Sequence, residues 1–157
     1  MIKSATGEVA RRTAGDQMKV TERKLGRIFH LQFERGEDFY GELTPFVKEK
    51  NIRSASVFVF GAMTTLDMIP GFRSMEGYDV DRRHFDDWRD LVGLGTISWP
   101  DQPPEALGEG VKWTEPQPYI HIHMAVSGAP GKTAEVLTGH LSDGITKGCS
   151  VDIYELT

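Results

Sequence analysis

The stretch "YIHIHMAVSG", residues 119–128, places two histidines two positions apart within an apolar run. Successive side chains of a β-strand point to opposite faces of the sheet. His121 and His123 therefore share one face of the predicted strand, roughly 6–7 Å apart along the backbone, which is close enough for both to bind one metal ion. The opposite face is apolar and is expected to pack against a hydrophobic core. It consists of Ile120, Ile122, Met124 and Val126.

A third histidine follows this strand after a short turn. The segment "SGAPGKT", residues 127–133, predicts a hairpin turn, because a phosphate-binding loop would require glycine where this chain has Val126. The returning chain would carry His140 past His121 and His123. Zinc sites in proteins have three or four protein ligands, and catalytic sites keep one position open. We therefore predict that these three histidines bind zinc or another divalent metal ion.

The same residues admit a simpler interpretation, in which the histidines lie without a metal on a half-exposed strand face. His30 and His84 have no comparable context, and we expect them to be structural or exposed. Glu135 and Asp143 flank His140 in the sequence and are typical of surface carboxylates. No pattern indicates a catalytic nucleophile, so catalytic residues are not assigned and it stays open whether the chain is an enzyme.

One helix is predicted at residues 36–51, "GEDFYGELTPFVKEKN". Its apolar residues recur at i, i+4, i+7 and i+8 and form one stripe. The residues of this stripe are Phe39, Leu43, Phe46 and Val47. Pro45 interrupts the pattern, since proline lacks the N–H that a helix interior uses, although proline suits a first helical position after a capping residue such as Thr44. The helix is therefore predicted to be bent or divided into two pieces.

The other apolar segments predict six or seven strands in a mixed or antiparallel sheet. Besides the histidine strand, strands are expected within residues 26–36, 54–69, 88–99 and 149–156, with a glycine dividing the second of these ranges into two strands. Residues 70–87 are polar and turn-rich and predict no defined element, and residues 100–118, rich in proline and glycine, predict a long loop. One or two helices with such a sheet indicate a single compact α+β domain.

The composition is that of one soluble domain. The chain has 157 residues, of which 39% are hydrophobic and 26% charged. No apolar run approaches the ~18 residues of a membrane span, and the N-terminal residues lack the apolar segment of a secretory signal, so no membrane partner is expected. Cys149 is the single cysteine, which excludes an intrachain disulfide and favours a cytoplasmic location.

Charge divides the chain near residue 24. Residues 1–24 hold six basic and three acidic side chains and are interpreted as a flexible N-terminal tail. Residues 25–157, the predicted domain, hold 12 basic and 20 acidic side chains, a net charge of −8. Affinity for nucleic acid depends on clustered lysine and arginine, so we do not expect this acidic domain to bind nucleic acid.

Four segments together resemble the plants-and-prokaryotes-conserved domain family, abbreviated PPC or PCC. They are "GRIFHLQFERGEDFYGELTPFVKEKNIRSASVFVFGAM", "LVGLGTIS", "HIHMAVSGAPGKTAEVLTGHL" and "CSVDIYEL", which together extend over residues 25–156. The spacing from His-x-His to Gly-His-Leu is the most specific part. The resemblance implies a compact α+β subunit that assembles as a homotrimer in prokaryotic members.

The resemblance also bears on metal and on DNA. The fold is similar to that of acetolactate decarboxylase, where three histidines bind zinc, and this similarity strengthens the metal assignment of His121, His123 and His140. In plants the domain follows an AT-hook that binds the DNA minor groove, and the family is often labelled DNA-binding for that reason. This chain has no Arg-Gly-Arg-Pro hook.

Two positions depart from the pattern of the family. Arg89 stands where the family commonly has glutamate, and Asp87 or Asp90 is the expected substitute if that glutamate shapes the site. Thr138 replaces the first glycine of the Gly-Gly-His-Leu signature.

Three functional hypotheses follow. The first is a trimeric, zinc-binding protein that binds or acts on a small molecule at the three histidines. The second is a DNA-associated regulatory protein, and the third is a structural assembly module in which the histidines stiffen the sheet. The loop at residues 100–118 carries Trp113 and Tyr119 toward the histidine strand, where it forms either a roof over a pocket or a simple surface loop.

Overall fold

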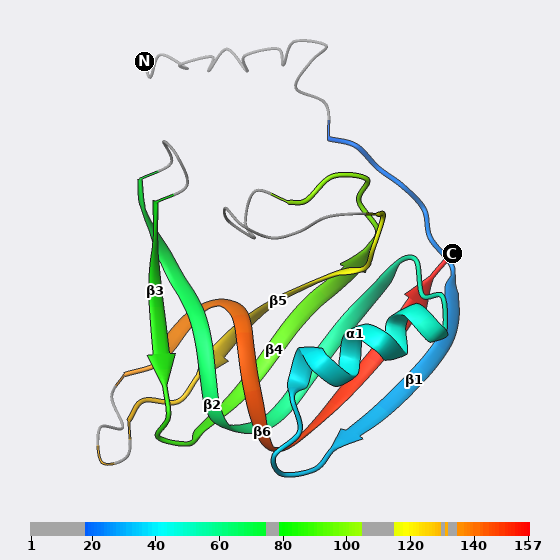
Figure 1. Cartoon of the computed structure of the whole chain (residues 1–157). Coiled ribbons are helices and arrows are strands. Elements are labelled where there is room, and N and C mark those ends of the chain that lie inside the picture. Colours follow the sequence, from blue (N-terminus) through cyan, green and yellow to red (C-terminus); the bar gives the residue numbers. More distant parts are fainter. Residues whose placement is uncertain (1–17, 75–78, 105–114, 130, 132–134) are drawn as a thin grey trace, which may run out of the picture.

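A computed structural model describes residues 18–74, 79–104, 115–129, 131 and 135–157. In this part of the chain there are six strands and one helix, so the structure is mostly sheet (Figure 1). In chain order the elements are β1 (Leu25–Phe33), α1 (Phe39–Glu49), β2 (Ala55–Ser74), β3 (Asp79–Phe85), β4 (Arg89–Ser98), β5 (Tyr119–Val126) and β6 (Leu137–Leu156). The prediction of one domain with a helix on a sheet is confirmed. Most of the predicted tail at residues 1–24 lies outside the described residues.

The sheet is antiparallel throughout, with the strand order β1-β6-β5-β4-β2-β3. The two 20-residue strands, β2 and β6, also pair with each other. Pairing therefore runs in a closed circuit from β2 through β4, β5 and β6 back to β2. β1 and β3 extend this circuit at opposite sides of the molecule (Figure 1). The closure places the first residues of β6 between β2 and β5, where the third histidine lies.

The glycine at position 61 bends β2 without ending it. The prediction of two strands within residues 54–69 is therefore wrong, since β2 continues to Ser74. Gly61 has φ +148°, and a Cβ at this position would lie 2.5 Å from the Cα atom of Cys149 on β6. Only glycine combines this backbone conformation with so close an approach of the paired strand, so pairing continues on both sides of the bend.

Residues 70–87 also differ from the prediction, because most of them are strand. The end of β2 pairs with β3, with Phe72 opposite Val80 and Asp67 opposite His84. β3 lies at the edge of the sheet and is largely exposed, so it carries polar side chains on both faces. A strand of this kind has no apolar alternation by which it could be recognised.

The helix α1 is a single piece, so the predicted division at Pro45 does not occur. Its start is capped by Asp38, whose Oδ1 accepts a hydrogen bond of 2.8 Å from the backbone N–H of Gly41. Three residues of the predicted apolar stripe, Phe39, Leu43 and Val47, are buried, and the fourth, Phe46, is partly buried against the core.

The hydrophobic core lies where α1 crosses the sheet (Figure 1). The apolar face of the histidine strand is buried as predicted, which leaves the histidines on the opposite face. Its buried residues are Ile120, Ile122, Met124 and Val126. In the described part of the chain, no helix is long and apolar enough to cross a membrane.

Candidate metal centre

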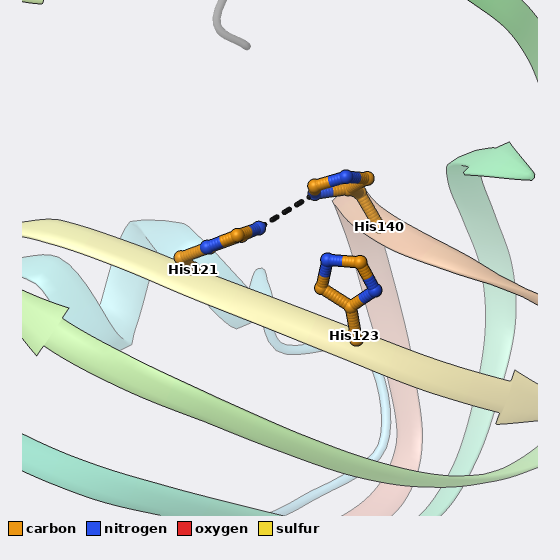
Figure 2. Close-up of side chains that lie close together, drawn as sticks. All are labelled: His121, His123 and His140. Carbon is orange, nitrogen blue, oxygen red and sulfur yellow. Dashed lines mark hydrogen bonds between the residues drawn. The ribbon is translucent and has the colours of Figure 1, made fainter. Parts of the chain in front are cut away.

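Three histidines from two neighbouring strands converge at one point on the exposed side of the sheet (Figure 2). His121 and His123 lie on β5, and His140 lies on β6 directly opposite His123. Directly opposite residues of antiparallel strands project to the same face. One ring nitrogen from each histidine lies within 4.8 Å of the other two. The predicted hairpin return of His140 is thus confirmed, whereas metal binding itself stays a prediction.

The approach of β6 to β2 beside the cluster depends on Gly139. A Cβ at this position would lie 2.2 Å from the carbonyl oxygen of Ile69 on β2, far inside van der Waals contact. The neighbouring Thr138 is exposed and pairs with Ala125, so a side chain is accommodated there. This difference explains why the chain keeps the second glycine of the family signature and can replace the first.

The distances between the histidines suit a tetrahedral metal ion. His121 Nε2 and His140 Nδ1 are 2.7 Å apart and share a hydrogen bond, one ring donating to the other (Figure 2). Zinc–nitrogen bonds of about 2.0–2.1 Å in a tetrahedron place the ligand nitrogens roughly 3.3 Å from one another. One ring nitrogen from each histidine lies within 4.8 Å of the other two, so the three donors are near enough for one ion to bind all of them. The donor set is therefore of a kind that could hold a metal ion.

The protonation state of the cluster also favours metal binding. Burial lowers the pKa of His121, and the nearby His123 lowers it further. Burial likewise lowers the pKa of His140 to about 4, with His123 and then His121 adding to the effect. Both imidazoles are therefore neutral near pH 7, and neutral imidazole is the form that binds metal ions. Neutral imidazole nitrogens are typical ligands of zinc.

Two hollows adjoin the histidines and give a bound ion access to ligands. The first, of about 620 Å³, is lined by His121 and His140 together with Tyr40, Arg82 and Tyr119. The second, of about 490 Å³, is more apolar and is lined by His123, His140, Pro70, Phe72 and Leu94, among others. His140 borders both hollows, so a metal ion at the cluster would be reached from either side. We call the first hollow the polar pocket.

The other two histidines do not join the cluster. His30 Nδ1 lies 2.6 Å from Asp152, and His84 Nδ1 lies 2.8 Å from Asp67. Both histidines are exposed, as predicted. They are therefore suitable controls for experiments on the cluster.

The acidic residues that flank His140 in sequence lie at the surface. Glu135 and Asp143 are both exposed. Asp143 borders the polar pocket, where its Oδ1 accepts a hydrogen bond of 2.8 Å from the backbone N–H of Gly144.

The two aromatic residues expected near the histidine strand differ in what the structure describes. Tyr119, at the start of β5, stacks on the ring of His121 with centroids 5.3 Å apart. Trp113, from the predicted loop, lies outside the described residues.

Arg89, at the position where the family commonly has glutamate, forms an ion pair with Asp87 away from the histidines. The guanidinium of Arg89 is buried and donates two hydrogen bonds to Asp87, of 2.8 and 2.9 Å, and one of 3.0 Å to the carbonyl of Ser127. Arg89 also lies over the ring of Phe85 at 3.8 Å. Asp90 borders a different hollow, so neither Asp87 nor Asp90 lines the two hollows beside the histidines.

Two residues of the polar pocket were not identified from the sequence. The hydroxyl of Tyr40 donates a hydrogen bond of 3.0 Å to the carbonyl of Leu141, next to His140. Burial raises the pKa of Tyr40 far above its ordinary value, so this phenol stays protonated. Arg82 reaches the pocket from β3, the strand that the sequence pattern missed. No local sequence pattern marks either residue as part of this pocket, because the pairing of distant segments brings each of them there.

Comparison with known families confirms the resemblance in the sequence. Residues 20–156 match the Plants and Prokaryotes Conserved (PCC) domain, and the chain belongs to this family. A search of curated proteins finds no match.

Solved structures of similar fold come from archaea and bacteria. A metal-containing protein from Archaeoglobus fulgidus is 25% identical, with TM-score 0.69 over 89% of this chain and 86% of that chain. A plant- and prokaryote-conserved protein from Pyrococcus horikoshii is 19% identical, with TM-score 0.70 over 89% and 85%. A "putative dna binding protein" from Bacteroides thetaiotaomicron is 22% identical, with TM-score 0.62 over 85% and 82%.

The predicted similarity to acetolactate decarboxylase is present but weaker. The enzyme from Bacillus subtilis is 16% identical, with TM-score 0.48 over 81% of this chain and 52% of that chain.

Proposed function

We propose that this chain binds one divalent metal ion, zinc in the first place, through His121, His123 and His140, and binds a small molecule at that ion. The observation that carries the proposal is the convergence of three ring nitrogens within 4.8 Å, in a group that contains no carboxylate. Three imidazoles leave a fourth position of a tetrahedral ion open. Zinc bound in this way polarises a carbonyl or lowers the pKa of a bound water molecule.

The surroundings of the cluster support the proposal. A pocket of about 620 Å³ adjoins two of the three rings and has the size of a small-molecule site. Stacking of Tyr119 on His121 restricts the orientation of that ring. The relative from Archaeoglobus fulgidus, 25% identical, is a metal-containing protein. The chain's own residues thus supply the ligands, the ring orientation and the cavity.

Elemental analysis of protein purified without chelators tests the metal assignment. We expect close to one zinc per chain, and loss of stoichiometric metal in His123→Ala with the fold retained, because His123 lies on an exposed strand face. His84→Ala is the matched control, since His84 is also an exposed strand histidine and should keep full metal content. Full metal content in His123→Ala would refute the three-histidine assignment.

We further propose that the chain forms a homotrimer, the assembly that the family resemblance implies. An exposed apolar face supports self-association: Phe60 on β2 is 72% exposed and lies opposite Val92 on β4, which is 55% exposed. The adjacent pair, Phe58 and Leu94, is 46% and 59% exposed. Contiguous apolar side chains of this kind are typical of surfaces that a partner covers. We call these four residues the apolar face.

A DNA-associated role is the second candidate function. It is supported by the similar fold of the Bacteroides protein, and by an exposed Trp88 whose ring lies 4.8 Å from Arg35 and 5.5 Å from Lys147, since aromatic and basic side chains together bind nucleic acids. The net charge of −8 over residues 25–157 opposes it. Salt-sensitive duplex binding in a low-salt gel shift, lost in Trp88→Ala, would favour this role over the metal-dependent one.

A further inference from the structure

Arg82 lines the polar pocket as an exposed cation, and the described residues supply it with no partner. It lies on β3 and lines the same hollow as His121 and His140. Among the described residues, it makes no hydrogen bond or ion pair. Its neighbours differ, because both Arg73 and Arg83 bind Asp81, at 3.2 and 2.9 Å. In the described parts of β2 and β3, Arg82 is therefore the arginine that pairs with no carboxylate, and its guanidinium is available to a ligand.

The other charged groups of this pocket already have backbone partners. Asp38 accepts a hydrogen bond from the N–H of Gly41 at the start of α1. Asp143 accepts one from the N–H of Gly144. With a divalent ion bound, these two carboxylates and Arg82 would leave the pocket with a formal charge of about +1, which favours an anion. Among the described residues, no acid forms an ion pair with Arg82.

Building on the proposed function, we propose that the small molecule is an oxyanion, a carboxylate or a phosphate ester, whose charge pairs with Arg82. A guanidinium binds either group through two parallel hydrogen bonds. A second oxygen of the same molecule occupies the open position of the metal ion. Arg82 is thus a specificity-determining residue, which selects the charge of the ligand and takes no part in holding the metal.

Ligand titration of cobalt-loaded protein tests this assignment through the visible spectrum of the ion. The probes are glycolate and its neutral counterpart glycolamide, with inorganic phosphate as a third. We expect glycolate or phosphate to bind at least about tenfold more tightly than glycolamide. Arg82→Gln should remove this preference while glycolamide binding stays unchanged. Arg83→Gln is the matched control, since it removes an equal charge from the adjacent, already paired position, and should keep the preference.

The outcomes separate this inference from the metal proposal. Metal content is measured first, and wild type and both variants should hold equal amounts. Absence of metal from the wild type would overturn the proposed function itself. With metal present, the role of Arg82 would be overturned if the wild type bound glycolate and glycolamide equally well, or if Arg82→Gln kept the anion preference. It would also be overturned if both variants lost the preference equally, or if Arg82→Gln alone lost metal. Whichever of glycolate and phosphate binds more tightly identifies the class of oxyanion.

Discussion

His123 on β5 and His140 on β6 are directly paired across the two strands, with ring centroids 4.0 Å apart. The same cross-strand row continues on the other side of His123 through Leu94 on β4 to Phe58 on β2. The proposed metal centre and the apolar face therefore belong to one surface of the sheet. Self-association through the apolar face would bring a second subunit to the border of the histidine cluster.

Gly139→Ala should damage both stability and metal binding. Its new methyl group would meet the carbonyl oxygen of Ile69 at 2.2 Å, so β6 must move away from β2 and carry His140 with it. Overpacking of this kind costs about 1–3 kcal/mol. We expect a lower free energy of unfolding in urea and reduced zinc content. Thr138→Ala, at the exposed adjacent position, should change neither by much, and equal behaviour of the two variants would contradict the role of Gly139.

Phe60→Asp should disrupt the proposed trimer. Burying a charge in the middle of the apolar face against another subunit is unfavourable. We expect light scattering to give the mass of a trimer for the wild type and of a monomer for the variant. Val20→Asp introduces the same charge at an exposed apolar residue outside the strands and should leave the mass unchanged. A wild-type monomer at micromolar concentration would remove the trimer from consideration.

Tyr40→Phe should destabilise the fold without abolishing metal binding. The substitution removes the hydrogen bond to the carbonyl of Leu141 and leaves that acceptor without this donor. The expected loss is about 1–3 kcal/mol in the free energy of unfolding. Since Tyr40 borders the pocket and donates nothing to the ring nitrogens, zinc content should stay near the wild-type value. Loss of zinc with unchanged stability would contradict this structural role.

Asp87→Asn should alter the acid dependence of stability. The hydrogen bonds from Arg89 hold the pKa of Asp87 below its usual value. A carboxyl whose pKa is lowered by folding stabilises the fold above its unfolded pKa, near 3.9, and this contribution is lost as the pH falls through the lower folded pKa. The variant should be less stable at pH 7 by about 1–2 kcal/mol and show a smaller further loss between pH 5 and pH 2.

Asp86→Asn provides the comparison for this experiment, because Asp86 is the exposed neighbour of Asp87. Its stability should follow the wild type across the same pH range, measured by urea unfolding at each pH. Identical acid profiles for Asp87→Asn and the wild type would show that the ion pair with Arg89 contributes nothing.

Much of the site could be predicted because its parts are local. The alternation of residues 119–126 places two histidines on one strand face. The glycine-containing turn then returns the chain so that His140 lies opposite His123. Both inferences use periodicities that act over a few residues. The buried side of α1 was predictable for the same reason.

The failures share a different cause. β2 continues through Gly61 because a distant strand, β6, approaches too closely for any side chain. β3 is strand because it pairs with the end of β2, although its own residues are polar on both faces. Pro45 lies inside an unbroken helix that is held by its cap at Asp38 and by its buried side. For β2 and β3 a tertiary contact outweighs the local preference, and in α1 the local cap and the burial of one side together outweigh the effect of Pro45.

The sequence by itself determined the family, the apolar faces of the individual elements and the identity of the three histidines, because these depend on residue type and short-range period. Only the tertiary structure decided how the strands close, with β6 lying between β2 and β5. That closure depends on which strand edges meet across most of the chain, and no local pattern encodes it. It brings Arg82 from β3 and Tyr40 from α1 to one pocket beside the histidines.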